Sequence, residues 1–113
     1  MPPVTIYHNP RCSKSRQTLS LLKERGIEPR VIEYLKDPPD EETLKTILKK
    51  LGMTPAELIR KREYRALGLP ETDDSETLIR RMIEHPEIIE RPIVVAGSKA
   101  RLGRPPERVL ELL

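Results

Sequence analysis

The first 35 residues indicate a strand, a helix and a second strand, and this order constrains the fold more than any other feature. Residues 4–7 alternate as a half-buried strand does, and residues 30–35 (RVIEYL) form a second strand-like run. Between them, residues 13–25 carry leucines at helical spacing and end at Gly26. Strands joined through a helix are usually parallel, with a right-handed crossover. The sequence therefore predicts a βαβ unit.

The middle of the chain is predicted to be helical. Three stretches with helix signals follow, at residues 40–52, 54–62 and 74–85. The first starts with Asp40 as an N-cap, and the second starts with a Thr-Pro-Ala-Glu capping box. Apolar residues recur at three- and four-residue intervals on the first and third stretches. We expect three helices here, with Arg60 inside the second.

The C-terminal part returns to strands. Residues 93–96 (IVVA) are typical of a buried strand, and residues 100–102 can pair back across a Gly-Ser turn. Pro105-Pro106 then begins a last helix. This order predicts an α/β protein with a thioredoxin-like fold and a helical insertion. Because 113 residues leave room for one core, we expect a single domain over residues 1–113.

The composition argues against several classes of protein. No apolar run approaches the roughly 20 residues that cross a bilayer, and no signal peptide is indicated, so we expect a cytoplasmic protein. The net charge of +3 comes from mixed signs, and the only aromatic residues are three tyrosines, so nucleic-acid binding is not expected. No heptad repeat is present, and we expect a monomer. Tyr7, Tyr34 and Tyr64 are most simply core or rim residues.

Cys12 is the single cysteine of the chain. An internal disulfide and a multi-cysteine metal site are therefore impossible. With only two histidines besides, we expect no metal and no bound cofactor. If Cys12 takes part in redox chemistry, the second thiol must come from another molecule.

Cys12 lies at the junction between the first predicted strand and the first predicted helix. The free N–H groups and the positive dipole end of that helix would stabilise a thiolate, and they would also hold an oxyanion. Arg11, Lys14 and Arg16 add positive charge, and His8 lies four residues upstream. A lone cysteine is often only a small buried apolar residue. From these observations, a structural cysteine and a reactive nucleophile both stay open.

Two further features favour a reactive Cys12. Ser15 replaces the second cysteine of a C-x-x-C motif and leaves a C-x-x-S site, which works through mixed disulfides. Arg91-Pro92 precedes the predicted third strand, where thioredoxin-like folds place a cis-proline next to the thiol.

Four blocks of the sequence resemble the glutaredoxin-coupled arsenate reductase family, whose members are ArsC-like. In chain order they are HNPRCSKSR at residues 8–16, LIR at 58–60, RPIVV at 91–95 and RLGRP at 101–105. The blocks occur in the family order, and the resemblance runs from Thr5 to about Leu112. Four ordered blocks are far more specific than one short motif.

The resemblance implies a role for each candidate site residue. Cys12 would be the nucleophile that attacks arsenate, His8 would help to keep it ionised, and Ser15 could hydrogen-bond its sulfur. Forked guanidinium groups suit a tetrahedral oxyanion. Glutathione would attack the Cys12–arsenic adduct as a co-substrate, and glutaredoxin would clear the resulting mixed disulfide. The oxyanion and the arseno-thiol intermediate would be bound by an arginine triad: Arg60, Arg91 and Arg104.

Two other functions remain open from the sequence. One is a regulator resembling the Spx-type proteins, which share this fold and bind RNA polymerase; they commonly carry a C-x-x-C switch that Ser15 removes here. The other is a glutathione-dependent thiol transferase, in which the arginines would hold glutathione carboxylates. A measurement of arsenate turnover distinguishes a reductase from both of these alternatives.

Overall fold

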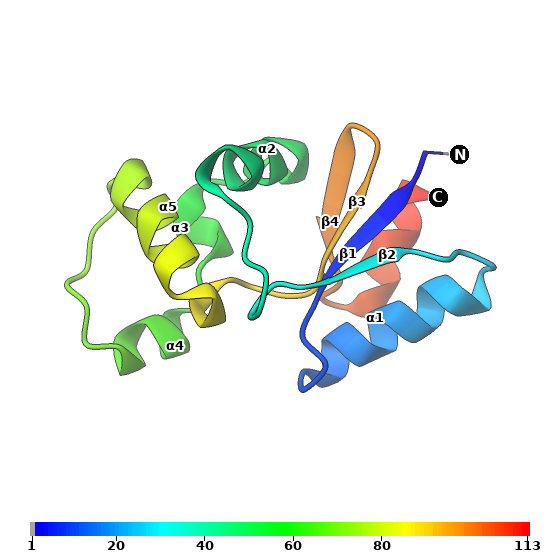
Figure 1. Cartoon of the computed structure of the whole chain (residues 1–113), viewed down its shortest axis with the longest axis horizontal. Helices are drawn as coiled ribbons and strands as arrows, with labels where there is room; N and C mark the ends of the chain where they lie inside the picture. Colours follow the sequence, from blue (N-terminus) through cyan, green and yellow to red (C-terminus); the bar gives the residue numbers. More distant parts are fainter. Residues whose placement is uncertain (1) are drawn as a thin grey trace.

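The computed structural model describes residues 2–113, and the predicted βαβ unit opens the chain (Figure 1). It consists of β1 (Val4–His8), α1 (Ser13–Glu24) and β2 (Arg30–Glu33). The two strands are parallel, and His8 lies opposite Glu33. The predicted second strand is two residues too long. The strand ends at Glu33, whose carbonyl accepts from the Lys36 and Asp37 N–H groups of the following turn. Tyr34 lies in this turn, and its side chain is 2% exposed.

The sheet has four strands in the order β2-β1-β3-β4. The predicted hairpin is confirmed: β3 (Ile93–Ala96) pairs antiparallel with both β1 and β4 (Lys99–Leu102). The last helix is a 3-10 helix, η2 (Pro106–Leu112), rather than an α-helix. Together with α1 it covers the apolar side chains of one face of the sheet, among them Ile6 and Val94. The predicted mixed α/β, thioredoxin-like fold is thus present.

The insertion between β2 and β3 is helical, as predicted, but its second helix is broken. The short helices α3 (Pro55–Leu58) and α4 (Lys61–Ala66) replace one helix over residues 54–62. At the break the chain is extended, because the Arg60 N–H donates to the Ile88 carbonyl and the Glu90 N–H donates to the Leu58 carbonyl. Tertiary hydrogen bonds thus outweigh the local helical preference. Arg60 lies at the N-cap of α4, outside any helix.

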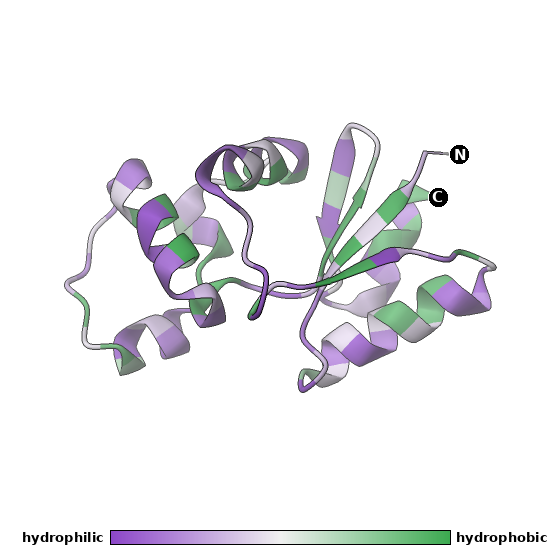
Figure 2. Cartoon of the chain, in the orientation of Figure 1, coloured by the Kyte–Doolittle hydropathy of each residue, from purple (hydrophilic) through white to green (hydrophobic). Residues whose placement is uncertain are grey.

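The other elements of the insertion match their sequence signals. Asp40 caps α2 (Glu41–Leu51) by accepting from the Thr43 N–H at 2.8 Å, and the Thr54–Glu57 capping box is formed. Apolar residues recur between polar ones along α2 and α5 (Ser75–Glu84), which places their leucines and isoleucines in the larger core cluster (Figure 2). The 3-10 turn η1 (Pro86–Ile88) then leads back to the sheet. No helix within residues 2–113 is long and apolar enough to span a membrane.

Gly103, directly after β4, packs closely against α1 and against Pro92, which precedes β3. Its N–H donates to the Pro92 carbonyl at 3.0 Å. A Cβ at Gly103 would overlap the hydroxyl of Thr18 on α1 and would lie 2.8 Å from the Pro92 ring. Since real Cβ atoms do not approach so closely, only glycine fits between α1 and the segment that leads into β3.

Candidate active site

Cys12 is the N-cap residue of α1, directly after the turn that ends β1. Its N–H donates to the Asn9 carbonyl at 3.0 Å, and its carbonyl accepts the Arg16 N–H at 3.0 Å. The backbone N–H groups of Ser15 and Lys14, in the first turn of α1, favour the thiolate form of its sulfur and so act to lower its pKa. The thiol is partly exposed. The predicted position at the N-terminus of the first helix is confirmed, and that position delivers donors to the sulfur.

The thiol of Cys12 is easier to ionise than an ordinary cysteine. Burial alone would raise its pKa, but the Ser15 N–H, the Arg91 guanidinium and the Lys14 N–H together outweigh burial and lower the pKa. Arg91 both hydrogen-bonds the sulfur and acts on it through its charge. The cation beside the sulfur therefore comes from the segment before β3, and Lys14 contributes through its backbone. Arg16 instead donates to the Pro10 carbonyl at 3.0 Å.

His8 and Ser15 hold the loop that carries Cys12. His8 Nδ1 and Ser15 Oγ form a buried hydrogen bond of 2.7 Å, and the Asn9 N–H donates to the same hydroxyl at 3.0 Å. The Ser15 side chain therefore holds the loop, whereas its backbone N–H serves the sulfur. Burial lowers the pKa of His8, with Glu33 opposing and Arg16 assisting. The roles of His8 and Ser15 in ionising Cys12 stay predictions.

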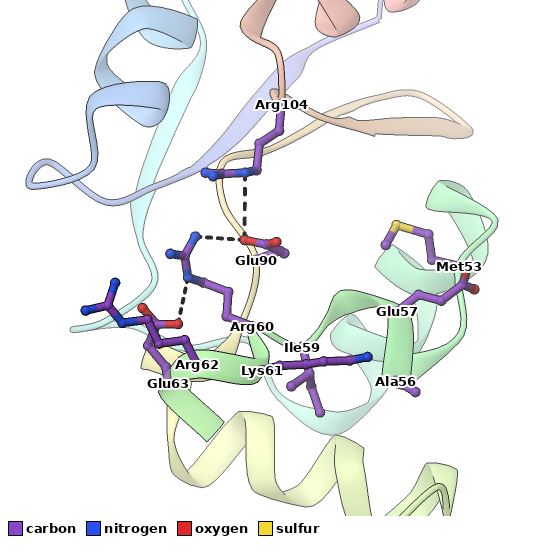
Figure 3. A pocket seen from close by; sticks show the side chains of 10 residues that line it. All are labelled: Met53, Ala56, Glu57, Ile59, Arg60, Lys61, Arg62, Glu63, Glu90 and Arg104. Atoms are coloured by element: carbon purple, nitrogen blue, oxygen red, sulfur yellow. Dashed lines mark hydrogen bonds and ion pairs between the residues drawn. The ribbon is translucent and has the colours of Figure 1, made fainter. Parts of the chain in front are cut away.

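Two of the triad arginines, Arg60 and Arg104, lie around Glu90 (Figure 3). Arg60 donates from Nη1 to Glu90 at 2.9 Å and from Nε to Glu63 at 3.0 Å. Arg104 lies on the other side of Glu90, with its Nε 3.9 Å from the carboxylate, and its Nη1 donates to the Arg91 carbonyl at 3.2 Å. Arg91 thus contacts Arg104 through its backbone carbonyl, and Arg104 and Arg60 share the Glu90 carboxylate. Their binding role in the triad remains a prediction.

Arg60, Arg104 and Glu90 face a surface groove, called here the arginine groove. The Arg91-Pro92 and Arg104-Pro105 peptides beside it are both cis, the first as expected for a thioredoxin-like fold. The residues that line the groove are Met53, Ala56, Glu57, Ile59, Arg60, Lys61, Arg62, Glu63, Glu90 and Arg104.

Sequence reasoning missed three residues at this site: Asn9, Tyr34 and Glu90. Asn9 holds the Cys12 loop, and its side chain accepts from the Arg11 N–H at 3.0 Å. Glu90 carried no usable signal, because its partners Arg60 and Arg104 come from distant segments rather than from its sequence neighbour Arg91. Nothing in the local sequence pointed to Tyr34.

A thioredoxin-like sheet with an activated thiol at the N-terminus of its first helix and arginines beside it defines a class of thiol proteins that handle anions. The chain belongs to the ArsC family, whose model matches residues 7–112. It is 57% identical to the uncharacterised protein YfgD of Escherichia coli (strain K12), over 97% of this chain and 96% of that one.

Two further relatives have names that state an activity. The arsenate reductase of Neisseria meningitidis serogroup B (strain MC58) is 48% identical over the full length of both chains. A solved structure of an arsenate reductase from Vibrio cholerae is similar with a TM-score of 0.88 and 46% identity, covering 99% of this chain and 98% of that one.

Proposed function

We propose that this protein reduces arsenate to arsenite through a Cys12 thiolate, with glutathione as the reductant and glutaredoxin as the partner that restores the thiol. The observation that carries the proposal is the Cys12 sulfur, which receives two backbone N–H groups and the Arg91 guanidinium. Relatives named arsenate reductase at 45–48% identity add support. Because glutathione is the abundant thiol of the cytoplasm, the proposal places the protein there.

The first step joins sulfur to arsenic. The Cys12 thiolate attacks the arsenic atom, a sulfur–arsenic bond forms, and one arsenate oxygen leaves with protons as water. Both reactants are anions, so the cations beside the sulfur must offset their repulsion. Arg91 would contact the sulfur and the oxyanion together. Arg60 and Arg104 would bind the remaining oxygens in place of the Glu90 carboxylate.

The second step needs a thiol from outside, because Cys12 is the only cysteine. The glutathione thiolate attacks the Cys12–arsenic adduct. Arsenic gains two electrons and leaves as arsenite, while the two sulfurs lose two electrons and end as a mixed disulfide. A glutaredoxin thiol then takes the glutathione and frees Cys12 as a thiolate.

A second candidate, a glutathione-dependent thiol transferase, is favoured by one observation. Arg60 and Arg104 already lie against a carboxylate, that of Glu90. The same guanidinium groups suit a carboxylate of glutathione, and a Cys12–glutathione disulfide belongs to both reactions.

The test is arsenate-dependent oxidation of NADPH, coupled through glutathione, glutaredoxin and glutathione reductase. We expect turnover by the wild type and a loss of at least about a thousandfold in Cys12→Ser, because removing a nucleophile abolishes the covalent route. Circular dichroism confirms that both proteins are folded. Folded wild type without arsenate turnover would contradict the proposal, and disulfide exchange with glutathionylated peptide would then identify the transferase.

A further inference from the structure

Two buried polar side-chain atoms have no hydrogen-bond partner, and both belong to residues whose charges or dipoles act together with Cys12. Across residues 2–113, the buried side-chain nitrogen and oxygen atoms that lack one are the Tyr34 hydroxyl and Arg91 Nε. Buried polar atoms are nearly always paired, because an unpaired one loses its hydrogen bonds to water. The Arg91 guanidinium lowers the pKa of Cys12 through hydrogen bonding and through its charge, so it acts directly on the candidate nucleophile.

The fold brings Tyr34 to the same edge of the sheet. Glu33 ends β2 opposite His8, which ends β1, so Tyr34 leaves the sheet where β1 passes into the Cys12 loop. Its side chain is 2% exposed. It lines a small, mostly apolar pocket to which Glu90 also contributes, and Glu90 binds Arg60. Glu90 therefore lines both this pocket and the arginine groove.

The charges at the site also reach the Tyr34 phenol. Burial raises the pKa of Tyr34, and the charge of Cys12 raises it further, whereas Arg91, hydrogen bonding by the Asn9 amide and Arg60 lower it. The Asn9 amide can only donate to the phenol oxygen in this role, so the hydroxyl proton itself is left without an acceptor. The net shift is upward, so the phenol keeps its proton at neutral pH. Tyr34 is thus a neutral donor near the nucleophile and two arginines of the triad.

We propose that the Tyr34 hydroxyl donates a hydrogen bond to an oxygen of the oxyanion that binds at Cys12, which makes Tyr34 a catalytic residue. The inference rests on the proposed function. A fixed donor that faces a developing negative charge needs no reorganisation during the reaction, and inside a protein it acts more strongly than in water. An oxyanion at Cys12 would give the unpaired hydroxyl its partner.

Tyr34→Phe tests the proposal, because it keeps the ring and removes one oxygen. We expect kcat/KM for arsenate to fall about 10- to 100-fold, as when one donor to an oxyanion is removed. The midpoint of denaturant unfolding should stay the same or rise, since the deleted hydroxyl is buried and its proton has no acceptor in the protein. A Tyr34→Phe protein with wild-type kcat/KM would overturn the proposal.

Tyr64→Phe is the matched control. The Tyr64 hydroxyl donates to the Pro70 carbonyl at 2.7 Å and accepts from Arg81, away from Cys12. Removing it should lower the unfolding midpoint and leave kcat/KM for arsenate unchanged. If Tyr34→Phe behaved in the same way, its hydroxyl would be a structural group only.

A binding experiment separates failure of this inference from failure of the proposed function. Arsenate bound at Cys12 should slow alkylation of the thiol by iodoacetamide, whether or not turnover follows. Tyr34→Phe should need about tenfold more arsenate for half-protection, with an unchanged alkylation rate when arsenate is absent. Equal protection of both proteins overturns the Tyr34 proposal alone. A wild type that arsenate does not protect overturns both.

Discussion

The Cys12 loop and the arginine groove are built in opposite ways. In the loop, residues 8–16 satisfy one another: His8 and the Asn9 N–H share the Ser15 hydroxyl, and the Asn9 carbonyl accepts from Cys12. In the groove, Arg60 and Arg104 come from distant segments and lie against Glu90. The Cys12 loop is thus held by hydrogen bonds among its own residues, with Arg91 added from a distant segment, whereas in the groove the arginines are already paired with a carboxylate. If an anion binds in the groove as proposed, it would have to displace that carboxylate.

Arg91 acts on Cys12 and also contacts Arg104 of the groove, so its replacement should change activity more than any other substitution considered. In Arg91→Ala the pKa of Cys12 should rise, because Arg91 lowers it through a hydrogen bond and through its charge. Less thiolate is then present at neutral pH, and one oxyanion donor is gone, so kcat/KM for arsenate should fall at least about a hundredfold. The rate of iodoacetamide alkylation against pH measures the pKa. Arg80→Ala removes an exposed charge on α5 as a control, and an equal shift there would refute the assignment.

Glu90→Gln should leave the guanidinium groups of Arg60 and Arg104 free to bind an anion, because it removes the carboxylate that they now contact. The carboxylate now neutralises Arg60, and glutamine keeps the shape without the charge. The arsenate concentration that half-protects Cys12 from alkylation should fall roughly three- to tenfold, a typical effect for one partly buried charge pair. Glu111→Gln removes the same charge from a pair with Arg101 and serves as the control. Weaker protection in Glu90→Gln would show that Glu90 supports anion binding instead.

The smallest expected effect is on the pH dependence of stability, to which His8 of the Cys12 loop contributes. The pKa of His8 is below its ordinary value of 6.5 in the folded protein, so between those two values the unfolded chain binds more protons. The free energy of unfolding should therefore fall as the pH drops through 6.5, by a fraction of the about 1.4 kcal/mol per pH unit that one full proton gives. In His8→Gln this part of the slope should disappear. Urea titrations at several pH values measure it, and identical slopes would contradict the prediction.

Local signals were enough to predict much of the fold. The βαβ unit, the hairpin, the cap at Asp40 and the capping box at Thr54 all depend on residues a few positions apart, and all are present. The break at Arg60 was missed because its hydrogen bonds go to Ile88, in another segment of the chain. The residues on either side of Arg60 favour a helix, and nothing among them indicates the hydrogen bond to Ile88.

The site shows the same division. Cys12 at the start of α1 could be predicted, because a strand, a turn and a helix place it there. Among the cations, it is Arg91 that acts on the sulfur most strongly, while the Arg16 guanidinium, which is nearer in sequence, donates to the Pro10 carbonyl. The resemblance had placed Arg91 in the triad, and the local sequence around Cys12 alone could not have done so. Tyr34 was interpreted as an ordinary core or rim residue, since only the folded chain shows a buried hydroxyl without a partner.

Gly103 gives the site a property that no charged residue controls. Because nothing larger than a hydrogen fits between its Cα, the Thr18 side chain and the Pro92 ring, α1 packs closely against the segment that carries Arg104. A side chain at Gly103 would push these two segments apart, and α1 has Cys12 at its N-cap. The packing between the parts of the chain that carry the thiol and Arg104 therefore depends on a residue that has no side chain to contact a ligand.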